Sequence, residues 1–201
     1  AAVWNNRIYV SGGYTGNINS SPTRLNTVVM SPILSSGGDI TSAWSSGGSS
    51  FNIARTSHTM ISYANNLYIL GGDNGTNYFS DVQFAKLDSA TGQAGSWGYS
   101  TSLPSPITQA DGFAVNGYMY LFGGRTTVND CTSRSLIAPI SANTSIASGN
   151  NPTGIGEWYQ TNRNYDGGRF GNSALYHKGK ALVIGGGCQG VVMADDFDPG
   201  L

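Results

Sequence analysis

The sequence predicts an all-β fold of the propeller class, built from four-stranded antiparallel units. Three observations support this prediction. An apolar strand that ends at a pair of glycines occurs four times in 201 residues, a tryptophan follows three of these pairs, and no segment shows convincing helical periodicity. The first glycines of successive pairs are 59, 52 and 62 residues apart. A unit of that length is the range expected for one propeller blade. The four pairs are Gly12-Gly13, Gly71-Gly72, Gly123-Gly124 and Gly185-Gly186.

The most complete unit runs from Arg55 to Trp97 and contains four expected strands. Residues 58–63 form the first, and an Asn65-Asn66 turn leads to the second at 67–70. This second strand is apolar on both faces, as expected of a strand enclosed between two sheets. Residues 82–87 alternate apolar and polar side chains and predict a third strand, after which Trp97 begins a short outer strand.

The same order predicts the other units. Their approximate limits are 1–50, 51–104, 105–164 and 165–201, the last being incomplete, so the chain contains about three and a half units. The glycine pairs are expected to end each second strand where the backbone bends sharply. Because tryptophan recurs at similar positions, we also expect a structural role for Trp44, Trp97 and Trp158.

These features resemble the kelch-repeat β-propellers. Tryptophan follows the glycine pair by 25 to 34 residues, and the family's Arg-x-x-His lead-in occurs as Arg55-Thr56-Ser57-His58. A partial copy begins at Arg169, whereas the corresponding position 107 is isoleucine. The long units are most similar to large bacterial surface kelch proteins. Propellers usually close with four to eight blades, so we expect this chain to be a segment of a longer propeller. A compact four-bladed ring and assembly with other copies are the alternatives.

Composition limits the range of functions. Charged residues make up only 10% of the chain and the formal net charge is −1. The chain therefore lacks the basic surface that nucleic acids or anionic lipids require. No segment is long and apolar enough to predict membrane insertion. The abundance of Gly, Ser, Thr and Asn is typical of an extracellular or cell-surface β-protein.

The two cysteines lie 57 residues apart, too far for a close metal-binding pair or a redox dithiol. Cys131 and Cys188 both follow a glycine pair closely, in consecutive units. A disulfide between neighbouring blades is one interpretation, and two unpaired thiols are the other.

The resemblance also implies an enzymatic alternative, because copper radical oxidases of the galactose oxidase type have kelch-like blades. Such a site needs tyrosine and histidine ligands and a tyrosine bonded to cysteine. The chain has only His58, at a repeat position, and His177, in an expected turn. We therefore predict no catalytic residues, no metal and no cofactor, and we rank an oxidase below the two binding functions.

Binding remains, and the loops between strands are where we expect it. Aromatic residues and arginine dominate binding energies at interfaces. The expected binding residues are Tyr14, Tyr78, Phe79, Arg125, Tyr159 and Tyr165. The sequence thus predicts a non-catalytic recognition or adhesion protein with a protein partner at a cell surface, or alternatively a lectin-like propeller that binds a glycan.

Overall fold

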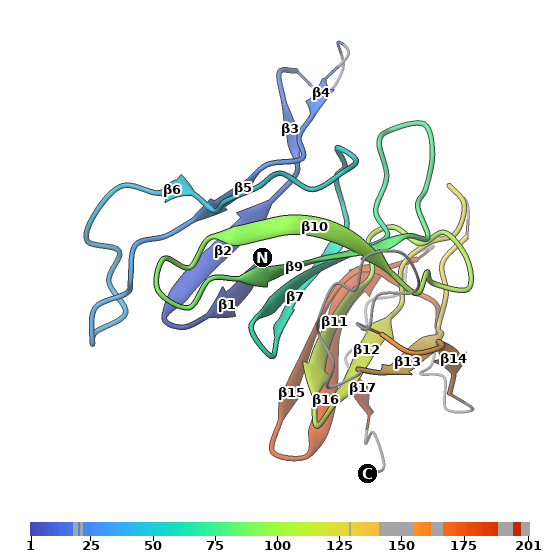
Figure 1. Ribbon diagram of the computed structural model, residues 1–201. Helices are drawn as coiled ribbons and strands as arrows, with labels where there is room; N and C mark the ends of the chain where they lie inside the picture. Colours follow the sequence, from blue (N-terminus) through green and yellow to red (C-terminus); the bar gives the residue numbers. More distant parts are fainter. Residues whose placement is uncertain are drawn as a thin grey trace.

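The computed structural model is an all-β protein made of successive antiparallel sheets (Figure 1). It describes residues 1–17, 20, 22–128, 130–140, 155–161 and 167–188, and the backbone of residues 195–197. Three sheets have four strands and the last has three described strands, each following the chain order, which confirms the prediction of four-stranded antiparallel units.

The strands are grouped as follows. Sheet 1 contains β1 (Ala2–Trp4), β2 (Arg7–Ser11), β5 (Val28–Met30) and β6 (Ser45–Ser46). Sheet 2 contains β7 (Thr59–Tyr63), β8 (Asn66–Leu70), β9 (Val82–Leu87) and β10 (Ala94–Ser100). Sheet 3 contains β11 (Asp111–Val115), β12 (Tyr118–Phe122), β13 (Ser135–Pro139) and β14 (Tyr159–Gln160). Sheet 4 contains β15 (Phe170–His177), β16 (Lys180–Gly187) and β17 (Asp195–Phe197). A separate ribbon, β3 (Tyr14–Thr15) with β4 (Thr23–Arg24), projects from sheet 1 (Figure 1).

The strand register repeats from sheet to sheet. The residue before the glycine pair lies opposite the first residue of the third strand in sheets 1, 2 and 3. The three pairs are Ser11 with Val28, Leu70 with Val82, and Phe122 with Ser135. Equivalent positions in different sheets can therefore be assigned from the register, without reference to sequence similarity.

The sheets pack face to face, and three apolar cores lie between them. In each interface we call the face turned towards the next sheet along the chain the trailing face, and the face turned towards the preceding sheet the leading face. Tyr9 and Met30 of sheet 1 pack with Leu67 and Ile69 of sheet 2. The trailing face of sheet 2 packs on the leading face of sheet 3, and the trailing face of sheet 3 packs on sheet 4. Both faces of the second strands in sheets 2 and 3 are thus covered, which explains their continuous apolar sequence.

No closed ring is formed by the sheets that the structure describes. The burial of each tryptophan depends on whether another described sheet precedes its own sheet. Trp97 and Trp158 are buried, and each donates its indole N–H to a backbone carbonyl just after the preceding sheet, Ser49 and Thr101 respectively. Trp44 has the same register position in sheet 1 but is 40% exposed, because no described sheet precedes it. A structural role for the three tryptophans stays a prediction, and among the described residues Trp97 and Trp158 are the ones buried between two sheets.

Candidate functional site

The loops that follow the glycine pairs lie side by side and form what we call the loop face. It consists of β3 and β4 of the ribbon, the segment 73–80 after sheet 2's glycine pair, and residues 125–128 and 130–132 after that of sheet 3. The Arg24 guanidinium lies against Gly75, so the first two segments touch. Residues of the second and third segments line one pocket, described below.

The glycine pairs hold these loops at the junction between sheets. Gly72 has a φ of +92°, and a Cβ atom there would lie 2.6 Å from the carbonyl oxygen of Thr56. Its N–H donates to Ile107 O at 2.8 Å, where the next unit begins. In the same way, the Gly13 N–H donates to the carbonyl oxygen of Arg55, and the Gly124 N–H donates to that of Arg169. Only glycine fits this close approach with positive φ, and the repeated bond fixes each loop relative to the next sheet.

Arg55 is the best anchored side chain of this junction. It is fully buried, and its guanidinium donates to both carboxylate oxygens of Asp81, at 2.9 and 2.8 Å. It also donates to Gly71 O at 2.8 Å and to Ile53 O at 3.1 Å. A planar guanidinium suits such bidentate pairing. Although position 107 carries isoleucine instead of arginine, its backbone N–H and carbonyl make the equivalent loop contacts.

Phe79, an expected binding residue, stacks against the Arg55 guanidinium, whose carbon lies 4.4 Å from the ring centroid. Its backbone N–H donates to Gly72 O, and its carbonyl accepts from Ile107 N. Phe79 is only half-buried. These contacts indicate that Phe79 supports the conformation of the loop.

His58 closes the junction from the inside. Its Nε2 lies 2.7 Å from Ser11 Oγ, and the ring lies against Gly12 of the preceding sheet, where a Cβ would be 2.6 Å from the imidazole. Its Nδ1 is shielded from solvent and has no hydrogen-bond partner among the described residues. Burial, and secondarily the nearby Arg55 charge, lower the pKa of His58 to about 3. The imidazole is therefore neutral near pH 7, and its contacts are structural.

A pocket of about 410 Å³ opens between the second and third loops. It is lined by Thr76, Asn77, Tyr78, Pro106, Thr126, Thr127 and Val128. All these side chains are uncharged, and they combine hydroxyl and amide groups with one aromatic ring. The pocket can therefore hydrogen-bond a neutral polar ligand and pack against its apolar parts.

The wall that carries Tyr78 is internally braced. Asp73 Oδ1 accepts from Gly75 N at 2.9 Å, while Oδ2 accepts from Thr108 Oγ1 of the next unit at 2.7 Å. Asn74 Oδ1 accepts from the backbone N–H groups of Thr76 and Asn77. These bonds fix the loop before any ligand binds, which lowers the entropic cost of binding. Tyr78 itself is half-buried.

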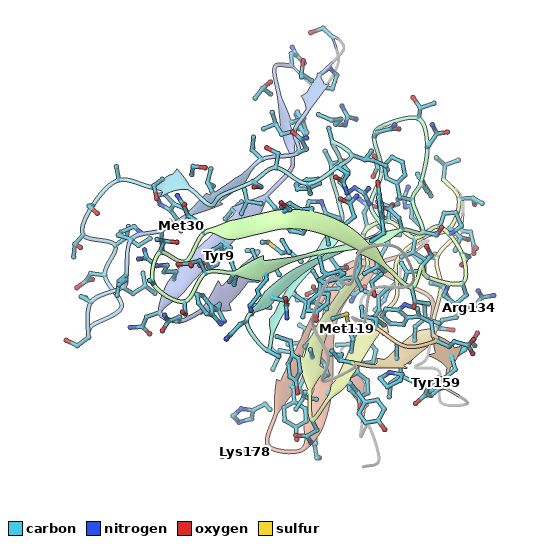
Figure 2. All side chains as sticks on the ribbon, in the orientation of Figure 1. Tyr9, Met30, Met119, Arg134, Tyr159 and Lys178 are labelled. Carbon is cyan, nitrogen blue, oxygen red and sulfur yellow. A yellow bond between two sulfur atoms is a disulfide. The ribbon has the colours of Figure 1, made fainter. Side chains whose placement is uncertain are left out.

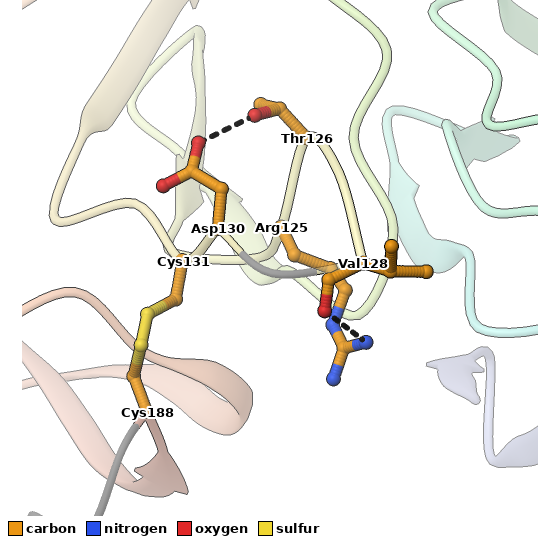
Figure 3. The surroundings of a disulfide bond; sticks show 6 residues. All are labelled: Arg125, Thr126, Val128, Asp130, Cys131 and Cys188. Carbon is orange, nitrogen blue, oxygen red and sulfur yellow. Dashed lines mark hydrogen bonds between the residues drawn. A yellow bond between two sulfur atoms is a disulfide. The ribbon is translucent and has the colours of Figure 1, made fainter.

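The opposite wall is tied to sheet 4. Arg125 lies over the Phe170 ring, with 3.7 Å from the guanidinium carbon to the centroid, and donates to Val128 O at 3.4 Å. Thr126 Oγ1 donates to Asp130 Oδ2 at 2.7 Å (Figure 3). Cys131 forms a disulfide with Cys188, just beyond β16, with the Cα atoms 6.1 Å apart (Figure 3). The disulfide interpretation of the sequence is thus confirmed.

The ribbon carries the third aromatic residue of the loop face. Tyr14 is 45% exposed, and Arg24, opposite it on β4, lies with its guanidinium carbon 5.6 Å from the tyrosine ring centroid. Arg24 also contacts Gly75, as noted above. A tyrosine and an arginine therefore border the loop that carries Tyr78.

The remaining expected residues lie elsewhere. Tyr159 is on the outer strand β14 opposite Ile137 (Figure 2), outside the three loop segments. Tyr165 lies outside the described residues. Sequence reasoning missed Arg24, Thr127 and Val128. Val128 is 73% exposed, which no sequence pattern indicated, and Arg24 could have been suspected because it lies in the polar segment after a glycine pair.

The described residues contain neither a metal-binding cluster nor a helix that could span a membrane. That part of the chain holds no group of three or more His, Cys, Asp or Glu side chains arranged to bind a metal ion. It likewise contains no helix with the length and apolarity needed to cross a bilayer.

A larger pocket, of about 780 Å³, lies beside the β9 to β10 turn of sheet 2, and its lining includes Asn65, Lys86, Asp88, Thr91 and Gln93. Hydrogen bonds from Thr91 lower the pKa of the exposed Asp88 carboxyl. The three Asp88 contacts with Ala90 N, Thr91 N and Thr91 Oγ1 are those of a turn. None of the expected binding residues lines this pocket.

No family model matches the chain. Over 73 residues it is 32% identical to the leucine-zipper-like transcriptional regulator 1 homolog of Drosophila melanogaster. That stretch is 36% of this chain and 7% of the fly protein. The chain therefore spans only a small part of this relative, and the match leaves its family unassigned.

Proposed function

We propose that this chain is a non-catalytic recognition or adhesion module with kelch-type propeller architecture, which binds a partner at a cell surface through the loop face. The observation that carries the proposal is the uncharged pocket between two braced loops, with Tyr78 and the exposed Val128 in its lining. Loops presented by a rigid scaffold are the usual place for binding residues.

The kelch-type part of the proposal is supported by the roles of the repeated residues. Arg55 and His58 lie where two sheets and a glycine pair meet, and both make contacts across that junction. Sheets 1 to 3 share one register, and the sheets pack in chain order through apolar faces. A succession of such sheets is the arrangement of neighbouring propeller blades.

The extracellular part rests on the Cys131–Cys188 disulfide, because disulfides persist mainly in oxidising compartments. It connects the loop face to sheet 4 and so stabilises one wall of the pocket. The small net charge of −1 also favours a partner that is recognised by shape and hydrogen bonds over one attracted from a distance.

A neutral glycan is the second candidate, and the pocket lining favours it specifically. Three threonine hydroxyls and the Asn77 amide can exchange hydrogen bonds with sugar hydroxyls, while the Tyr78 ring can stack on the apolar face of a pyranose. A protein partner would contact a larger part of the loop face, including Tyr14 and Arg24.

Two parallel assays test the proposal: capture of partners from a cell-surface protein extract, identified by mass spectrometry, and binding to a glycan array. Both use the wild type, Tyr78→Ala and Val128→Asp. Tyr159→Ala is the matched control because this exposed tyrosine lies outside the loops. We expect the wild type to bind one class of partner reproducibly. The two loop variants should lose this binding, and the Tyr159→Ala control should keep it. Equal binding by all four proteins, or binding by none, would overturn the proposal.

A further inference from the structure

The Cys131–Cys188 disulfide joins the loops that follow the last two glycine pairs (Figure 3). Cys131 lies in the third segment of the loop face, three residues after Val128, which lines the pocket. Cys188 directly follows β16. Both cysteine residues are half-buried, so a small reductant in solution can reach the bond. The disulfide therefore supports a wall of the pocket and is also open to chemical attack.

The two walls of the pocket are attached to the sheets in different ways. In the second segment, Asp73 accepts a hydrogen bond from Thr108 of the next unit at 2.7 Å. In the third segment, the hydrogen bond between Arg125 and Val128 joins two residues of the segment itself. The third segment is attached to sheet 4 near its two ends, by the stacking of Arg125 on a ring of sheet 4 and by the disulfide. Without the disulfide, the second end retains hydrogen bonds of Thr132, which open far more readily than a covalent bond.

The packing of sheet 4 on sheet 3 rests on other contacts. Phe122 and Val183 belong to one apolar core between the two sheets. The Asp111 carboxylate accepts a hydrogen bond from Ala174 N at 2.9 Å, which joins the first strands of both sheets. These contacts do not involve the cysteines. Breaking the disulfide should therefore loosen the pocket wall and leave the sheets packed.

We propose that the disulfide is a redox switch of the loop face, and that its reduction by a dithiol frees the wall that carries Val128 and weakens binding there. The effect on binding rests on the function proposed above. One thiolate of the dithiol attacks a sulfur of the disulfide, forms a mixed disulfide and releases the other cysteine. The second thiol of the reductant then displaces the remaining cysteine. Two electrons and two protons pass to the cysteines, and the reductant becomes a disulfide.

Amide hydrogen exchange, followed by NMR, tests the wall without a ligand. The chain is reduced with dithiothreitol under native conditions, capped with iodoacetamide and freed of both reagents. Thr132 N–H donates to Gly124 O at 2.9 Å, and we expect it to exchange at least about tenfold faster after reduction. Phe79 N–H, which donates to Gly72 O at 2.9 Å in the second segment, is the matched control and should keep its rate. Unchanged exchange at Thr132, or equal acceleration at both amides, would overturn the proposal.

Binding is tested with the same capped chain and with a variant that combines Cys131→Ser and Cys188→Ser. Each competes with labelled oxidised chain for intact cells, and both should compete at least about tenfold more weakly than unlabelled oxidised chain. Oxidised chain treated with iodoacetamide alone is the control and should compete fully. Full competition by the capped chain would also overturn the switch. Oxidised chain that binds no cells would contradict the proposed function instead, and the exchange rates would still decide whether the wall is released.

Discussion

Truncation of two equivalent tryptophans should have very different effects on stability. Trp97 is 9% exposed, its indole N–H donates to Ser49 O at 2.9 Å, and its ring meets Phe51 edge-on with 5.8 Å between centroids. Trp44 has the same register position in sheet 1, but it is 40% exposed and makes no indole hydrogen bond within the described residues. We expect Trp97→Ala to lower the free energy of unfolding by about 3–5 kcal/mol, as for other buried aromatic residues.

The expected difference follows from the structure. A tryptophan offers at most about 250 Å² for burial, so the difference in exposed fraction corresponds to roughly 80 Å². At about 25 cal/mol per Å² this area contributes about 2 kcal/mol. The hydrogen bond to Ser49 adds about 1 kcal/mol. Trp44→Ala should therefore cost about 3 kcal/mol less than Trp97→Ala, which leaves a cost of about 0–2 kcal/mol.

Equilibrium urea denaturation followed by circular dichroism measures both costs. Trp97→Phe is a useful intermediate, because it keeps an aromatic ring but removes the hydrogen-bond donor. Equal costs for Trp44→Ala and Trp97→Ala would refute the conclusion that burial by a preceding sheet distinguishes the two positions.

Three further predictions concern the junctions between sheets. Arg55→Met should cost about 3–5 kcal/mol in urea denaturation, because it leaves the Asp81 carboxylate without its buried partner. Adding Asp81→Leu to it should cost less than the sum of the single changes. The folded-state pKa of His58, about 3, lies below the unfolded value of 6.5, so the unfolded state binds more protons between these values. The unfolding free energy should thus fall as pH drops from 6.5 towards 3, by up to about 1.4 kcal/mol per unit. Replacing His58 with Gln should flatten that slope, and an unchanged slope would contradict the assignment. Finally, serine at both Cys131 and Cys188 should cost about 2–5 kcal/mol, measured as a lower urea midpoint. Loss of the reductant sensitivity of that midpoint is the accompanying check.

Much of the fold could be predicted because glycine, tryptophan and apolar runs recur at matching offsets. The expected second strand at 67–70 lies within β8, and the expected third strand at 82–87 coincides with β9. The turn between β7 and β8 lies at Ala64-Asn65, one residue earlier than the Asn65-Asn66 turn that the sequence predicts. Positive φ values occur at Ala64 and Asn65, while Asn66 pairs with Tyr63 in the sheet. Cross-strand pairing decides the turn residues, and the Asn-Asn pattern alone does not reveal that pairing.

The exposure of Trp44 and the composition of the pocket could not be predicted from the sequence. A repeat position predicts a side chain's direction, but burial requires a neighbouring sheet, which Trp44 lacks among the described residues. The pocket brings Tyr78 together with Thr127 and Val128, about fifty residues later in the chain. Their proximity follows from the way successive sheets pack, and no local pattern marks it. For Cys131 and Cys188, which both follow a glycine pair, the sequence left a disulfide and two unpaired thiols as alternatives, and the structure decides for the disulfide.

The central functional claim is that the loop face is the binding surface. The most direct measurement is the equilibrium binding of labelled wild-type chain to intact cells of the source organism, in competition with unlabelled proteins. We expect saturable binding that wild type and Tyr159→Ala compete equally, and that Tyr78→Ala competes at least tenfold more weakly, the loss of about 1.4 kcal/mol or more expected for a central aromatic residue. Equal competition by Tyr78→Ala, or binding that does not saturate, would contradict the claim.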